Sequence, residues 1–203
     1  MSMDWIDSRR RSNTMIYATL ADRVTGVQFG VATYHMPCAF FAPRVMVLHS
    51  AMAATRTAQL SEGLPFVLTG DFNLKPGDET YRLLTEGVIP PDPKATFTPA
   101  LPENSKIKPF WTEIPKKLKS AYKEVQGEEP EFTNYAVTRG SAPFIETLDY
   151  IFHSPEIEAL EVRPLPPKAQ AVGPYPTESE PSDHAMIAAT LRIPASTFTM
   201  RDA

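Results

Sequence analysis

The sequence predicts a mixed α/β domain, and three features of its pattern favour this fold class. Two β-rich segments, 14–21 and 27–34, flank a short turn, which is typical of a hairpin. Residues 44–61 instead carry apolar side chains at roughly helical spacing. Further short helical and strand-like segments follow. This order of elements favours helices layered on sheets.

The boundary residues place each element along the chain. Pro43 suits the first turn of helix 44–61. An apolar strand, 66–70, comes next, and a short helix over 78–86 is closed by Gly87. A proline-rich stretch then runs to about residue 117. After it, strands are expected at 132–138, 147–153, 157–163 and 185–193.

Composition excludes several classes of protein. The 203 residues suffice for one sizeable core, and 42% hydrophobic with 22% charged residues is ordinary for a globular protein. A net charge of -4 excludes a general basic field, so binding to a polyanion would need a local patch or a metal ion. Six lysines between residues 106 and 123 form either such a patch or a solvated surface.

The cellular location is predicted from what the sequence lacks. The single cysteine, Cys38, excludes a disulfide framework and favours a reducing compartment. No apolar run reaches membrane-spanning length, and the first residues do not resemble a signal peptide. We therefore expect no membrane partner and a cytoplasmic location, with a nuclear or mitochondrial one left open.

Polar side chains gather at the ends of the expected strands. Each alone has a structural explanation, because Asp and Asn form turns and caps and a lone His is usually a structural residue. Structural roles do not predict so many groups of complementary chemistry at strand edges. They are His35, Asp71, Asn73, Asp149, Asp183 and His184.

This set of residue types suits metal-assisted cleavage of phosphate esters. Carboxylate and amide oxygens are the ligands that Mg²⁺ or Mn²⁺ prefers, and such an ion offsets charge on the phosphate. A histidine can donate to phosphoryl oxygens, with an aspartate on its other nitrogen fixing the tautomer. A further aspartate can orient or deprotonate the attacking water.

The motifs HMPC, GDFN, TLDYIF and PSDH, in this order, resemble the endonuclease/exonuclease/phosphatase superfamily of metal-dependent phosphodiesterases. LKSAY, FTNY, TLDYIF and PSDH are more narrowly similar to its CCR4-type branch of deadenylases, nocturnin-like enzymes and 2′,5′-phosphodiesterase relatives. The resemblance implies a four-layer α/β/β/α sandwich of the DNase I-like type. It also implies one partial domain over 1–203, with an irregular or disordered N-terminus at 1–13 and a tail at 194–203.

The resemblance assigns roles to the polar residues. Asp71 matches the aspartate that orients or deprotonates water, and Asn73 matches the amide that holds the phosphate or metal-bound water. Asp183 matches the aspartate on the metal side, so the implied metal ligands are Asp183, Asp71 and Asn73. His184 matches the histidine that faces the phosphate, with Asp149 as its orienting carboxylate.

The resemblance also indicates how a substrate would be held. His35 matches the second histidine beside the scissile phosphate. Phe144 falls where deadenylases place an aromatic that stacks on adenine, and Phe40 occupies the facing position. An aromatic clamp is one reading, and Phe40 as a core residue is the other. Asn134 and Tyr135 either line the same cleft or, in the case of Tyr135, pack as a buried strand aromatic.

One part of the family pattern is missing. The resemblance implies a glutamate in the first half of the domain as principal metal ligand, and no stretch of this sequence matches it. We therefore expect weaker metal binding and an exposed sheet edge or apolar face, because the first part of the sandwich is missing. A fragment of an active enzyme is the favoured explanation. Completion by a partner chain and a divergent chain without catalysis are the others.

Three functions follow. The leading hypothesis is a metal-dependent phosphodiesterase that acts on RNA 3′ ends, favours poly(A) and releases 5′-nucleotides. The second, on the same fold, is an enzyme that cleaves 2′,5′-oligoadenylate or a small nucleotide. The third is a catalytically impaired module that binds adenine or RNA or serves in assembly.

Overall fold

A mixed five-stranded sheet forms the centre of the computed structural model, which describes residues 3–38, 42–89, 99, 111–137 and 140–194. The strand order is β1-β2-β3-β7-β4, and two two-stranded sheets, β5-β6 and β8-β9, complete the strands of this part of the chain. The expected α/β class is confirmed. The strands are β1 Met15–Ala21, β2 Gln28–Tyr34, β3 Phe66–Asp71, β4 Lys119–Ser120, β5 Asn134–Ala136, β6 Phe144–Glu146, β7 Asp149–His153, β8 Glu158–Val162 and β9 Ala189–Arg192.

The expected hairpin is confirmed. β1 and β2 pair antiparallel from Met15↔Tyr34 to Ala21↔Gln28. The Asp22 carboxylate closes the turn, because it accepts hydrogen bonds from the backbone N–H groups of Val24 and Thr25. β2 then runs parallel to β3, and β3 pairs antiparallel with β7.

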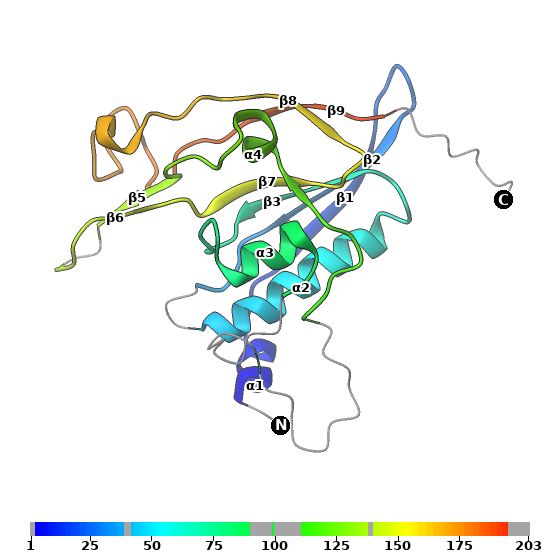
Figure 1. Cartoon of the computed structure of the whole chain (residues 1–203), viewed down its shortest axis with the longest axis horizontal. Coiled ribbons are helices and arrows are strands. Elements are labelled where there is room, and N and C mark those ends of the chain that lie inside the picture. The colour runs from blue at the N-terminus through cyan, green and yellow to red at the C-terminus, as the bar shows by residue number, and fades with distance from the viewer. Residues whose placement is uncertain (1–2, 39–41, 90–98, 100–110, 138–139, 195–203) are drawn as a thin grey trace, which may run out of the picture.

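Helices cover one face of the central sheet. Figure 1 shows α1 (Met3–Arg9), α2 (Pro43–Leu60) and α3 (Glu79–Glu86) on the same side, with α4 (Ala121–Gln126) and β8-β9 on the other. The two helices expected from the sequence, α2 and α3, are confirmed. Gly87 ends α3 at φ 85°, in the left-handed region that favours glycine. A short 3₁₀ helix spans Lys168–Gln170.

The expectation of an irregular N-terminus is wrong for Met3–Arg9, which is helical. Tertiary contacts explain why this short segment holds a helix. The Trp5 ring packs edge-on against the buried Trp111 ring, with centroids 5.2 Å apart. Asp4 forms an ion pair with Arg44 of α2 at 3.7 Å. The tail expected at 194–203 lies outside the described residues from 195 onward.

The strands of the second half are shorter than expected. Among the described residues, the expected strand 132–138 is reduced to Asn134–Ala136 and the expected strand 185–193 to Ala189–Arg192. The strand β6 and the short β4 were not predicted. The reason is visible around His184, which forms an isolated bridge with Asn134. The chain thus leaves this bridge before it joins β8, and 185–188 do not form a strand.

The two faces of the central sheet differ in burial. On the helical face, aromatic residues fill the core, and the Phe72 ring packs edge-on against Tyr150 and Phe152. On the other face, Ile16 and Leu20 of the edge strand β1 are 65% and 45% exposed. These two exposed side chains agree with the expected exposed apolar face, and the missing first part of the sandwich stays a prediction. None of the helices in the described part of the chain has the length and apolarity needed to cross a bilayer.

Candidate functional site

Asp71 is the last residue of β3, and a glycine before it sets its position. Gly70 has φ 140°, and a Cβ at this residue would lie 2.1 Å from the carbonyl oxygen of Tyr34. Glycine therefore allows β2 and β3 to approach closely. Asn73 follows in the left-handed region at φ 51°, and its backbone N–H donates to Asp71 Oδ1 at 2.9 Å.

Asn73 connects this tip to the end of β2. Its side-chain amide donates to the Met36 carbonyl at 3.1 Å and to Asp71 Oδ2 at 3.4 Å. The Met36 N–H donates to the Asp71 carbonyl at 2.8 Å. Backbone contacts thus hold both polar side chains of the GDFN motif, those of Asp71 and Asn73, so their positions are fixed without a ligand.

Asp149 begins β7 directly beside Asp71. The two residues are paired across the antiparallel strands. Burial and the neighbouring Asp149 charge raise the pKa of Asp71, with burial the larger cause, while the Asn73 N–H and the two histidines act against the rise. A carboxylate with a raised pKa is a stronger proton acceptor than an ordinary one.

His184 lies against both carboxylates. Its Nδ1 is 2.7 Å from Asp149 Oδ2, and its Nε2 is 3.9 Å from Asp71 Oδ2. The hydrogen bond to Asp149 is the main cause that raises the pKa of His184, and burial opposes it. Because Nδ1–H donates to a carboxylate, Nε2 is the nitrogen that faces Asp71.

His35 approaches the same carboxylate from β2. Its Nε2 is 3.3 Å from Asp71 Oδ2, and its imidazole is largely exposed. The Asn13 side-chain amide donates to the His35 carbonyl at 2.7 Å and holds this turn. A chain of contacts thus joins five residues that the sequence analysis singled out: His35, Asp71, Asn73, Asp149 and His184.

The recorded hydrogen bonds of Asp183 are made by its backbone carbonyl. Its carbonyl accepts hydrogen bonds from the Tyr135 N–H at 2.9 Å and the Asn134 side chain at 3.1 Å, while the residue itself is exposed. Among the described residues, no group of three or more His, Cys, Asp or Glu side chains could hold a metal ion. The described donors therefore do not by themselves make a complete metal site.

The predicted substrate-binding residues differ in environment. Phe144 is half-buried in β6, paired with Ala136 of β5. Asn134 is buried, and its side-chain amide donates a hydrogen bond to the Asp183 carbonyl. Contact of Asn134 with a substrate therefore stays a prediction. Tyr135 packs against Tyr175 with ring centroids 5.5 Å apart. Phe40 lies outside the described residues.

Sequence reasoning missed Thr133, which is fully buried just before β5. Its hydroxyl donates to Asp149 Oδ2 at 2.7 Å, the same oxygen that His184 contacts. The FTNY motif was noted for its amide and aromatic residues, and a threonine within it gave no separate signal.

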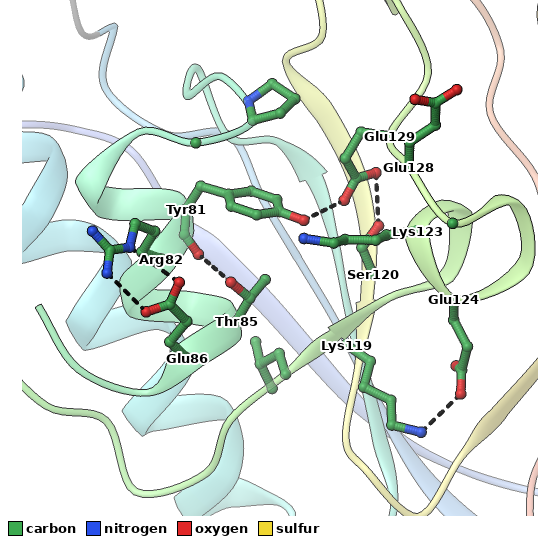
Figure 2. A pocket seen from close by; sticks show the side chains of 14 residues that line it. Tyr81, Arg82, Thr85, Glu86, Lys119, Ser120, Lys123, Glu124, Glu128 and Glu129 are labelled. Atoms are coloured by element: carbon green, nitrogen blue, oxygen red, sulfur yellow. Dashed lines mark hydrogen bonds and ion pairs between the residues drawn. The ribbon is translucent and has the colours of Figure 1, made fainter.

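A pocket of about 720 Å³ lies apart from this cluster, between α3, β4 and α4 (Figure 2). None of the predicted site residues that the structure describes lines it. The Glu129 carboxylate in its wall accepts hydrogen bonds from the Tyr81 and Ser120 hydroxyls at 2.7 and 2.9 Å. Ion pairs join Arg82 to Glu86 and Lys119 to Glu124. Because charges of both signs pair within the lining, the pocket indicates no single ligand chemistry.

Comparisons with known proteins show which family the chain is similar to. The model of the endonuclease/exonuclease/phosphatase family matches residues 4–184. Carbon catabolite repressor protein 4 homolog 4 of Arabidopsis thaliana is 37% identical over 132 residues, which are 63% of this chain and 27% of that protein. Human 2′,5′-phosphodiesterase 12 is 32% identical over 158 residues, 73% of this chain and 23% of that protein. The chain thus spans about a quarter of the length of these relatives.

Solved structures share the fold. ANGEL2, described as a 2′,3′-cyclic phosphatase, superposes with a TM-score of 0.72 at 20% identity, covering 92% of this chain and 63% of that one. The human nocturnin catalytic domain gives a TM-score of 0.60 at 20% identity, covering 91% and 54%. At this identity the likeness shows the fold alone. It confirms the expected fold class.

Proposed function

The chain belongs to the endonuclease/exonuclease/phosphatase family, and we propose that it serves the hydrolysis of phosphodiester bonds at the 3′ ends of RNA. The observation that carries this proposal is the contact of His184 with Asp149 at 2.7 Å, beside the paired carboxylate of Asp71. An imidazole oriented by one carboxylate and facing another can supply and accept protons within one reaction.

Each residue has a defined part in this reaction. Asp149 holds the proton on Nδ1 of His184, and its charge favours the imidazolium form. The Nε2–H of that imidazolium can then donate to a phosphoryl oxygen and stabilise the charge that develops there. Asp71, whose pKa is raised by burial, can take the proton of the attacking water. As the water oxygen bonds to phosphorus, the bond from phosphorus to the 3′-oxygen of the preceding nucleotide breaks, and this oxygen leaves as a hydroxyl after it takes a proton from solvent. His35 faces Asp71 from the exposed side, where a second phosphoryl oxygen would lie.

A divalent cation, Mg²⁺ or Mn²⁺, is part of the proposal. Asp71, Asn73 and Asp183 supply the oxygen chemistry that such an ion prefers, and the ion would offset negative charge on the phosphate. The described residues fall short of a complete ligand set. We therefore propose that further ligands come from outside the described part of this chain.

The proposed substrate is an adenine-containing 3′ end, with poly(A) favoured. The half-buried Phe144 in β6 supports it, since an aromatic face can stack on a base. A relative from Aspergillus clavatus, named as the 3′-5′-exoribonuclease subunit Ccr4 of the CCR4-Not complex, supports action at RNA 3′ ends. The human 2′,5′-phosphodiesterase 12 supports the second candidate, cleavage of 2′,5′-oligoadenylate or a small nucleotide. Either substrate places a phosphodiester beside His184, so the catalytic proposal is common to both.

The uncovered sheet face supports a proposal about assembly. Ile16 and Leu20 of β1 are exposed, whereas Ile151 of β7 on the same sheet packs against the cluster under β8-β9. We propose that a further β layer, from a partner chain or another segment, covers this face in the active protein. The free Cys38 supports a reducing, cytoplasmic location.

An assay on an adenosine oligonucleotide tests the function. Cleavage with Mg²⁺ that is lost with EDTA and in Asp71→Ala supports the enzyme, and the exposed β8 carboxylate variant Glu161→Ala serves as the matched control. Binding without cleavage that survives both EDTA and Asp71→Ala would instead support a non-catalytic adenine-binding module.

A further inference from the structure

The Thr133 hydroxyl uses its full hydrogen-bonding capacity at the candidate site. It donates to Asp149 Oδ2 at 2.7 Å and accepts from the backbone N–H groups of Leu148 at 2.9 Å and Asp149 at 3.0 Å. A hydroxyl has one proton and two lone pairs. Because both lone pairs are occupied, the proton has only the Asp149 carboxylate to point to.

The Thr133 backbone contacts the segments that carry Asp149 and His184. Its carbonyl accepts a hydrogen bond from the Ala185 N–H at 2.7 Å, and its own N–H donates to the Glu146 carbonyl at 3.1 Å. One residue, with no exposed surface, thus contacts the segment before Asp149 and the segment after His184. Their relative placement depends on Thr133 from both sides.

We propose that Thr133 is a positioning residue, whose hydroxyl fixes the Asp149 carboxylate so that Oδ2 receives the Nδ1–H of His184. A terminal carboxylate torsion is broad and can rotate. With two donors converging on Oδ2, rotation would break both bonds, so the carboxylate holds the imidazole in one orientation. The Nε2 of His184 is then directed toward Asp71.

The effect of Thr133 on rate rests on the proposed function, whereas its effect on the His184 orientation does not. Two pairs of side chains isolate the hydroxyl. Val has nearly the shape of Thr without the hydroxyl, and Ala differs from Ser by the hydroxyl alone. Thr133→Val and Thr133→Ala are therefore the test variants, and Thr133→Ser is the matched control.

The first readout is the proton resonance of the His184 Nδ1–H in metal-free protein, assigned by its absence in His184→Asn. A hydrogen bond to a carboxylate shifts this resonance far downfield. We expect Thr133→Ser to retain it, and Thr133→Ala and Thr133→Val to shift or lose it. The second readout is turnover of an adenosine oligonucleotide with Mg²⁺. There kcat should fall about 10–100-fold in Ala and Val, with KM nearly unchanged, and Ser should stay close to wild type.

Two outcomes overturn the inference. One is an unchanged Nδ1–H resonance in a folded Ala or Val variant. The other is failure of both variants to fold while Ser folds, which would show that the hydroxyl serves folding alone. If the resonance responds as expected but wild type cleaves no oligonucleotide, positioning is supported and the proposed function is the part that fails.

Discussion

Asp71 and Asp149 are direct partners across β3 and β7, and the two carboxylates share one histidine between them. Strand pairing creates this closeness, although 78 positions would separate the residues along an extended chain (149 minus 71). Two adjacent carboxylates repel, and His184 offsets that repulsion when it carries a proton. The site thus holds carboxylates that can attract a cation and a protonated imidazole that can attract a phosphate.

Replacing the partner of His184 tests its role most directly. In Asp149→Asn the side-chain amide no longer favours the imidazolium, so Nε2 loses its role as a proton donor. We expect kcat on an adenosine oligonucleotide to fall at least about tenfold, with stability little changed. Asp22→Asn, in the remote hairpin turn, is the control for removing a charge. Equal activity of wild type and Asp149→Asn would contradict the role of this pair.

Gly70 offers a prediction about folding. Any side chain there meets both an unfavourable φ of 140° and the Tyr34 carbonyl at 2.1 Å. We expect Gly70→Ala to lower the free energy of unfolding by about 3 kcal/mol or more, as measured by urea denaturation. Gly77→Ala is matched, since φ is 88° and nothing lies within 4 Å of its Cβ. It should cost only about 1–2 kcal/mol, and equal losses in both variants would exclude the close approach as the cause.

Phe144 tests the substrate class. If its ring stacks on a base, Phe144→Leu loses about 1–3 kcal/mol of binding, which is a rise in KM of about 5–150-fold. Phe144→Tyr keeps an aromatic face and should retain KM within a few-fold. The measurement compares an adenosine oligonucleotide with a base-free phosphodiester. If Leu raises KM equally for both substrates, Phe144 acts on the fold and not on the base.

Local signals in the sequence predicted much of the fold. Pro43 and Gly87 marked helix ends correctly, and the turn after β1 formed as expected. The helical spacing of apolar residues over 44–61 predicted the buried face of α2 less well. Met52 of α2 is 40% exposed, while the residues on either side of it are buried. The predicted strand 185–193 is longer than the observed β9. The bridge between His184 and Asn134 is a long-range contact, and the local sequence pattern does not predict it.

The candidate site likewise contains some residues that the sequence could predict and others that it could not. Chemistry-bearing residues such as Asp71 and His184 stand out by type at strand ends, so their convergence could be predicted before any geometry was known. Thr133 could not be found in this way, because its role depends on which oxygen its hydroxyl faces. The helix at Met3–Arg9 was likewise invisible, since it depends on the contact of Trp5 with Trp111.

His49 of α2 offers a prediction about pH and stability. Its Nδ1 lies 2.6 Å from the Tyr34 hydroxyl and its Nε2 lies 3.2 Å from the Ser8 carbonyl. Burial raises the pKa of Tyr34 to about 12, so the tyrosine stays a neutral donor. Burial also lowers the pKa of His49, with the charge of Arg11 contributing and the Ser8 hydrogen bond opposing. The folded protein therefore favours a neutral His49 that joins α1 to β2.

The sign of the effect follows from proton binding. Below the unfolded pKa of about 6.5, the unfolded chain binds the proton more readily than the folded one. Stability from His49 is complete above that pH and is lost as pH falls toward the lower folded value. His184, with its raised pKa, acts in the opposite sense, so total stability alone does not isolate His49.

A difference measurement isolates it. His49→Gln keeps a donor and an acceptor but does not titrate. Urea denaturation of both proteins at pH 8.0, 6.5 and 5.0 gives the free energy of unfolding at each pH. We expect the free energy of unfolding of wild type to exceed that of His49→Gln most at pH 8.0, and this difference to shrink toward pH 5.0. The reason is that only wild type has a buried imidazole whose protonation destabilises the folded state. A constant difference across this range would mean that the contacts of His49 do not depend on its protonation state.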